Sequence, residues 1–317
     1  MTNKDALNLP PILPIGTAVV MLREVRDSGG SLCHPKGAAG VVSEVPAVPH
    51  EPYRVRFAAG DEAHFARWEF EVLARFVDPF AALRPGGASD AELREALVFR
   101  CVVGSRAYGL ARDGSDTDRR GAYLAPARLH WSIFDVPGQI EQTSTQECYW
   151  EVGKLVRLAL KGNPNVLEAL WSPIIEHLDP VIEPIVAERR IFLSKFLFQT
   201  FNGFAISQHR QMTQDIRTLG APKWKQAMHL VRLLRMGIAA LDSGELSVLA
   251  DGQRAELLAI RDGEVSWEEL ERLRASLHRE LEDALARSVL PNQPDFARAN
   301  ELVVAARAES ARRGGFR

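Results

Sequence analysis

The sequence has few cysteines, no long apolar run and almost no net charge. Its three cysteines form no Cys-x-x-Cys pair, which argues against a disulfide framework or a zinc knuckle and favours a reducing, cytoplasmic setting. No run of about 18 apolar residues occurs, so no membrane span is expected. The net charge of -2 gives no bulk attraction to nucleic acid, although a local basic face would be sufficient for such a substrate.

The composition is that of a globular protein, with 46% hydrophobic and 25% charged residues in a chain of 317. Because domains typically contain about 100–200 residues, two or three units are expected. The pattern of apolar and turn-forming residues changes twice along the chain. We therefore predict an α+β protein with three parts: a small accessory β-barrel over residues 1–82, a mixed palm domain over 90–178 and a helical domain over 179–317.

The N-terminal region contains short β segments broken by glycine and proline. Residues 18–22, 40–42 and 53–57 are the clearest of them. Strands of this length and spacing are typical of an SH3-like barrel. An accessory packing module explains this region, and a protein partner bound through the barrel is the functional alternative. Residues 83–89 are rich in turn-forming residues and predict a linker.

The C-terminal third has apolar residues at helical spacing. The periodicity predicts helices over 191–212, 223–241 and 266–290. Ser266 and Glu269 have the spacing of a capping box, which marks the start of the third helix. The region therefore predicts a helical partner for the mixed domain.

A short apolar strand, predicted over 98–103, stops at Gly104 and Ser105. If the chain turns into a helix there, it presents backbone N–H groups and a hydroxyl at the positive end of a helix dipole, where phosphates bind readily. Glycine allows a ligand phosphate to approach the backbone closely. This segment predicts a phosphate site.

Asp116 and Asp118 lie two residues apart in a second predicted strand, over 116–124. Because side chains alternate along a strand, both carboxylates should face one side, whereas Arg119 should point away and form a structural ion pair. Two carboxylates on one face suit Mg²⁺, which binds few protein ligands and retains positions for phosphates. A phosphate cradle followed by an acidic pair predicts nucleotidyl transfer.

These residues resemble the signature of the DNA polymerase β-like nucleotidyltransferase superfamily, and more narrowly its predicted RNA-repair, ligase-associated branch. The similarity is carried by Gly-Ser-Arg-Ala-Tyr-Gly at 104–109 and Gly-Ser-Asp-Thr-Asp-Arg-Arg-Gly at 114–121. Further matches occur over 154–168 and 225–233. The resemblance covers about 93–269 and excludes the N-terminal region.

The resemblance implies a palm domain, a helical partner domain and transfer of a nucleotide from a nucleoside triphosphate with Mg²⁺ or Mn²⁺. By this match Gly104 and Ser105 contact the phosphates, while Asp116 and Asp118 hold the metal. The acceptor is a hydroxyl or a phosphate, with an RNA end among the candidates. Two alternatives stay open: a nucleotide-sensing module with weak catalysis, and a protein-modifying enzyme of toxin–antitoxin type.

Enzymes of this type usually have a third carboxylate on a neighbouring strand. We predict Glu147 for this position as a catalytic and metal-binding residue, because residues 145–150 can be extended just before a helix. Glu141 is the competing assignment, and an ordinary surface acid is the structural alternative.

Several basic residues are candidates for binding the triphosphate. Lys154 lies near the predicted palm, and Lys225, His229 and Arg232 form one stripe of a helix at positions i, i+4 and i+7. A surface lysine and a solvated helix face explain these residues without any ligand. We therefore predict that all four residues bind the nucleotide, and a purely structural surface role stays open as the alternative.

Overall fold

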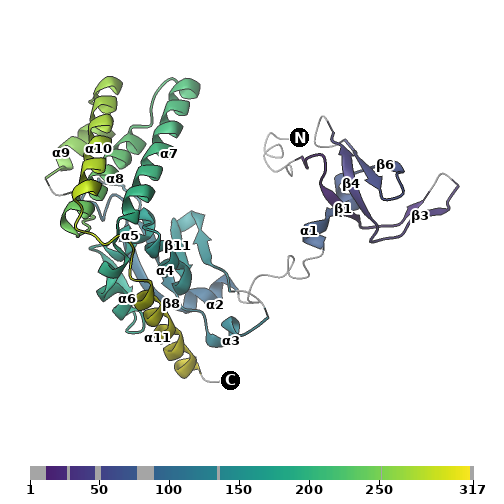
Figure 1. The fold of residues 1–317 in the computed structure, drawn as a ribbon, viewed down its shortest axis with the longest axis horizontal. Coiled ribbons are helices and arrows are strands. Elements are labelled where there is room, and N and C mark those ends of the chain that lie inside the picture. Colours follow the sequence, from purple (N-terminus) through teal and green to yellow (C-terminus); the bar gives the residue numbers. More distant parts are fainter. Residues whose placement is uncertain are drawn as a thin grey trace. The chain divides into compact units, whose positions relative to one another are not determined.

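A computed structural model describes most of the chain, and its contacts divide it into two units, residues 1–84 and 85–317 (Figure 1). The predicted linker falls outside the described residues except for Ser89. The described ranges are 12–26, 29–46, 51–76, 89–133, 136–250 and 252–314.

The N-terminal unit is a five-stranded antiparallel sheet in the order β6-β5-β4-β1-β7, with a separate β2-β3 pair. Its inward-facing residues, such as Val19, Val55 and Phe70, form a small core of their own. In the described residues the edge strands β6 and β7 do not pair, so the closed SH3-like barrel that we predicted is not seen. The elements are β1 (Ala18–Met21), β2 (Val25–Arg26), β3 (Leu32–His34), β4 (Ala39–Glu44), β5 (Tyr53–Phe57), β6 (Glu62–Phe65), η2 (Arg67–Glu69), β7 (Phe70–Val72) and α1 (Leu73–Phe76).

The second unit begins with a mixed five-stranded sheet in the order β10-β11-β9-β8-β12. The central strand β9 is antiparallel to β8 and parallel to β11. The predicted strand over 98–103 is confirmed as the apolar strand β8, and the strand predicted over 116–124 is found as β9, which begins only at Asp118. The elements are α2 (Asp90–Glu95), β8 (Leu97–Val103), β9 (Asp118–Tyr123), α3 (Ala127–His130), β10 (Gln139–Gln142), η3 (Thr143–Thr145), β11 (Glu147–Glu151), α4 (Val152–Leu160), α5 (Pro164–Leu170) and β12 (Ile175–Leu178).

The remainder of this unit is helical, and the three predicted helices are confirmed as α7, α8 and α10. The Ser266 hydroxyl accepts from the Glu269 N–H at 3.2 Å, and the Glu269 carboxylate accepts from the Ser266 N–H, so the predicted capping box forms. The elements are α6 (Glu183–Ala187), η4 (Arg189–Phe192), α7 (Phe196–Leu219), α8 (Trp224–Ser243), α9 (Arg254–Arg261), α10 (Trp267–Arg287) and α11 (Phe296–Gly314).

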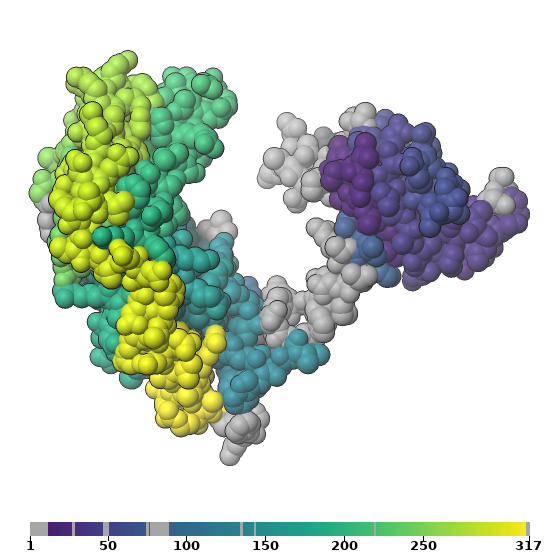
Figure 2. Space-filling model, viewed as in Figure 1, coloured from purple at the N-terminus to yellow at the C-terminus, as the bar shows by residue number. Residues whose placement is uncertain are grey.

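One hydrophobic core joins the sheet and the helices of this unit. It extends from Phe99 in β8 through Leu155 in α4 and Leu234 in α8 to Ala306 in α11. Helix α8 packs between α7, α9 and α10, while α11 returns along the sheet-bearing part and contacts α3, α4 and α6 (Figures 1 and 2). None of the described helices has both the length and the apolar character needed to cross a lipid bilayer.

Candidate active site

The chain leaves β8 at Gly104 in a left-handed conformation, with φ of +72°. A Cβ at this position would lie 2.6 Å from Asp118 Oδ2, so only glycine accommodates both the turn and the neighbouring carboxylate. Residues 104–109 form successive turns, not the helix that we expected. In the described part of the chain, the N–H groups of Ser105 and Arg106 have no hydrogen-bond acceptor. An anion at this turn would therefore accept hydrogen bonds from these two N–H groups, and no regular helix dipole would contribute.

Asp116 and Asp118 face one cavity of about 290 Å³ together with Gly104 and Ser105. Asp118 opens β9 opposite Val103, and Asp116 precedes it by two residues in the segment before the strand. Arg106 holds this segment in place by donating to the carbonyl oxygens of Ser115 at 2.8 Å and Asp116 at 3.3 Å. The cavity therefore combines a turn with unpaired N–H groups and two carboxylates, as the motif predicts.

Helix α8 brings Lys225 and His229 to the same cavity. Two arginines that the sequence reading missed, Arg112 and Arg261, also line it. Arg112 forms a bidentate ion pair with Asp262, and Arg261 donates to the Leu110 carbonyl at 3.0 Å. Several cations thus surround the space beside the Ser105 turn, which suits a polyanion such as a triphosphate.

Burial lowers the pKa of His229, and the charges of Arg232, Lys225 and Arg261 add to this effect against the opposing Glu168, so that the pKa falls from 6.5 to about 4. The folded protein therefore holds this imidazole neutral, and the unfolded chain binds more protons below pH 6.5. The free energy of unfolding should consequently decrease as the pH falls, and at pH 4.5 it should be about 2–3 kcal/mol lower than at pH 7.5. Urea unfolding of the wild type and His229→Gln at pH 7.5 and 4.5 should show a smaller loss in the variant. Equal losses would contradict a neutral, buried His229.

Arg232 does not reach the cavity, which corrects its predicted role in nucleotide binding. It is 6% exposed, its Nη2 lies 2.5 Å from Glu168 Oε1, and its guanidinium stacks over the Tyr108 ring at 3.6 Å. The Tyr108 hydroxyl donates to Glu168 Oε2 at 2.5 Å. Arg232 is two turns beyond Lys225 on α8, where the helix enters the core. Through these contacts Arg232 connects α8 to α5 and to the turn that contains Ser105.

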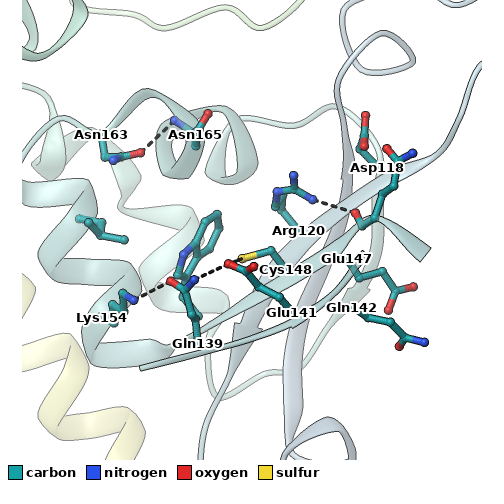
Figure 3. Close-up of a pocket in the computed structure, with 13 residues that line it drawn as sticks. Asp118, Arg120, Gln139, Glu141, Gln142, Glu147, Cys148, Lys154, Asn163 and Asn165 are labelled. Carbon is teal, nitrogen blue, oxygen red and sulfur yellow. Dashed lines mark hydrogen bonds between the residues drawn. The ribbon is translucent and has the colours of Figure 1, made fainter. Parts of the chain in front are cut away.

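Lys154 also lies away from the Ser105 turn. Its Nζ donates to Gln139 Oε1 at 2.6 Å, and it lines a second cavity of about 690 Å³ (Figure 3). Of the four predicted nucleotide-binding cations, the structure brings Lys225 and His229 to the aspartates and leaves Lys154 and Arg232 elsewhere. Arg119, in contrast, forms the expected structural ion pair, with its Nε 2.8 Å from Glu176 Oε2.

The structure does not bring Glu147 together with Asp116 and Asp118 as one metal-binding group among the residues that it describes, and the assignment of Glu147 stays a prediction. In the parallel pairing of β11 with β9, Glu147 lies opposite Arg119, so the register places it on the face opposite to Asp118, although its side chain lines the larger cavity that Asp118 also lines. Arg94 Nη1 contacts its carboxylate at 3.1 Å. Figure 3 shows this side chain extending away from Asp118. The competing Glu141 lies on the correct face but two strands from β9, where its carboxylate accepts from Gln139.

Glu147→Gln should therefore leave nucleotide transfer within about twofold of the wild-type rate. Loss of the partly buried pair with Arg94 should lower the free energy of unfolding by about 1 kcal/mol. Initial transfer rates and urea unfolding curves measure the two effects. A fall in rate of a hundredfold or more, with the fold intact, would restore Glu147 to the site.

Gln146, and not a carboxylate, is the neighbouring side chain that contacts Asp116. It directly precedes β11, and its carbonyl oxygen accepts from the Arg119 N–H at 3.3 Å. Its φ of +53° is left-handed, and its Nε2 donates to Asp116 Oδ2 at 3.2 Å. No pattern in the sequence marks this glutamine, because its place depends on the register and on the turn before β11.

The donor set fits a divalent cation with few protein ligands. Two carboxylates share one cavity, and carboxylate oxygens are ligands that Mg²⁺ accepts. In the described residues, no group of three histidine, cysteine, aspartate or glutamate side chains could hold a metal ion. Asp116 and Asp118 would therefore hold the ion, with the remaining positions left to substrate and water.

A mixed sheet whose paired aspartates face a glycine-serine turn is the arrangement of a DNA polymerase β-like nucleotidyltransferase palm. The model of the family RlaP, described as the RNA repair pathway DNA polymerase beta family, matches residues 87–305. The chain belongs to this family, which confirms the resemblance found from the motifs. No curated protein matches the sequence.

Proposed function

We propose that the chain transfers a nucleotide from a nucleoside triphosphate to an acceptor hydroxyl or phosphate, with Mg²⁺ or Mn²⁺ as cofactor. An RNA end is the acceptor that the description of the family favours. The observation that carries the proposal is the single cavity lined by Ser105, Asp116, Asp118 and Lys225. It combines hydrogen-bond donors, carboxylates and a cation at the scale of a triphosphate.

Each group in this cavity has a defined task in the proposed reaction. The N–H groups of Ser105 and Arg106 donate to phosphate oxygens, and Lys225 and Arg261 neutralise their charge. Neutral His229 donates or accepts a hydrogen bond without adding a charge. A divalent ion bound by Asp116 and Asp118 would stabilise the charge on the phosphates and lower the pKa of an acceptor hydroxyl.

In the proposed step, the acceptor oxygen forms a bond to the α-phosphorus of the triphosphate. The bond from that phosphorus to the oxygen bridging to the β-phosphate breaks, and pyrophosphate leaves with the electron pair. The acceptor proton passes to solvent, since the register places Glu147 on the face opposite to Asp118. Positioning and charge neutralisation supply the catalysis, because the protein forms no covalent intermediate.

The test is label transfer by the full-length chain. Each α-labelled nucleoside triphosphate is incubated with Mg²⁺ or Mn²⁺ and with RNA bearing a 3′-hydroxyl, RNA bearing a 5′-phosphate, or a protein with exposed hydroxyl groups. The proposal expects label in an acceptor and an equal amount of pyrophosphate. Absence of both, with every triphosphate and acceptor, would contradict it.

A second candidate is a nucleotide-binding module with weak or no catalysis, and the contact of Asp116 with Gln146, and not with a carboxylate, favours it. Such a module would bind triphosphate, measured by calorimetry, without releasing pyrophosphate. Gln146→Asp distinguishes the two candidates, because a gain in turnover from this one change would indicate a site impaired only by its missing acid.

The N-terminal unit lies outside the residues that the family model matches. We propose that it serves as an SH3-like accessory module that binds a protein partner in the cytoplasm. Deleting it should therefore leave label transfer to a free acceptor unchanged and abolish co-purification of the partner.

A further inference from the structure

A second cavity adjoins the candidate active site and shares Asp118 with it. It has a volume of about 690 Å³, within the range of roughly 300–1,000 Å³ typical of ligand sites. Its floor is the face of the sheet that carries Asp118. Strand register places Arg120, Cys148 and Glu141 in one row across β9, β11 and β10, on this same face (Figure 3).

Among the lining residues labelled in Figure 3, Asp118 lies on one side of the view and Lys154 and Gln139 lie on the other. Because Asp118 also lines the cavity beside Ser105, it is the point where the contents of the two cavities meet. In-line transfer needs the attacking oxygen and the leaving pyrophosphate on opposite sides of the phosphorus. If the triphosphate binds beside Ser105, the second cavity remains available to the acceptor.

The lining holds five amide side chains, the two cations Arg120 and Lys154, and the three carboxylates Asp118, Glu141 and Glu147. Asn165 presents an amide donor and acceptor of the kind that reads the edges of nucleobases, whereas Gln139 already bonds Lys154 and Glu141, and the Asn163 side-chain oxygen accepts from backbone N–H groups of α5. Arg120 is fixed by donating from Nη1 to the carbonyl oxygens of Arg119 at 2.8 Å and Gln146 at 2.9 Å. Lys154 is fixed by Gln139. Two preorganised cations suit phosphodiester groups.

We propose that this second cavity binds the unpaired terminal nucleotide of a polynucleotide, with its terminal hydroxyl beside Asp118. The proposal rests on the proposed function and adds the acceptor subsite and its chemical class. Asn165 reads the base edge, and Lys154 neutralises the phosphate on the far side of the terminal sugar. The terminal oxygen forms the bond to the α-phosphorus, pyrophosphate leaves with the electron pair, and the proton passes to solvent.

The experiment compares two ligands on the same full-length variants. A fluorescent single-stranded RNA hexamer is titrated by anisotropy without nucleotide, and triphosphate is titrated by calorimetry. Asn165→Ala and Lys154→Gln should each weaken hexamer binding about tenfold and leave triphosphate binding unchanged. Lys225→Gln should do the opposite. Lys161→Gln, an exposed position just beyond the same helix as Lys154, is the matched control and should change neither.

Equal hexamer affinity in Asn165→Ala, Lys154→Gln and the wild type would overturn the proposal. Label transfer to a peptide hydroxyl in preference to the hexamer would also overturn it, since the cavity would then bind a protein acceptor. Binding of the hexamer that depends on Asn165 and Lys154, without any label transfer, would support the subsite and contradict the proposed catalytic function. The two failures are therefore distinguishable.

Discussion

Replacing Asp118 by asparagine is expected to lower the rate of nucleotide transfer about a thousandfold. Asp118 lines both cavities, so its carboxylate lies where the proposed acceptor and the transferred phosphate would meet. Asparagine has nearly the same shape and can keep the close approach to Gly104, so the fold should be retained. What is lost is the negative charge that would hold the proposed divalent ion. Initial rates of label transfer at saturating triphosphate measure the effect.

Two controls make this expectation specific. Circular dichroism should give the same melting temperature for Asp118→Asn and the wild type within a few degrees. Glu176→Gln removes an acid from the same sheet that pairs with Arg119 and lines neither of the two cavities, so it should retain the transfer rate. If Asp118→Asn kept more than a tenth of the wild-type rate under these conditions, the paired aspartates would not be the catalytic centre.

The residues near the chemistry were predictable because their signals are local. A strand that stops at Gly104-Ser105 and an Asp-x-Asp pair can be read over about a dozen residues, and both aspartates line one cavity although Asp116 lies just before β9. The helices α7, α8 and α10 were equally predictable from apolar spacing and, for α10, from its capping box. These features depend on residues adjacent in sequence.

The differences from the sequence predictions arose where a residue's place depends on distant parts of the chain. Glu147 and Gln146 exchange faces if the register of β11 against β9 changes by one residue, and nothing in a single sequence determines that register. Arg232 lies on the same helical stripe as Lys225, but α8 runs from the cavity into the core between them. Closure of the N-terminal sheet is likewise a question of pairing between strands distant in sequence.

Arg232→Ala should lower the free energy of unfolding by about 3–5 kcal/mol, the largest effect on stability expected from a single change in this unit. Arg232 and Glu168 are each 6% exposed, so removing the guanidinium leaves a buried carboxylate without its countercharge. The stacking over Tyr108 is lost as well. Because Tyr108 belongs to the turn after Gly104, the variant should also weaken triphosphate binding. Urea unfolding and calorimetry measure the two effects.

The same helix offers a matched control, because Arg235 pairs with Glu256 near the surface, where the carboxylate is 41% exposed. Arg235→Ala should therefore cost less than about 1 kcal/mol. Arg232→Met combined with Glu168→Leu should recover much of the stability, since no charge is then left buried without a partner. If Arg232 instead bound the triphosphate directly, Arg232→Ala would weaken that binding while leaving the unfolding curve unchanged, and the double variant would recover nothing.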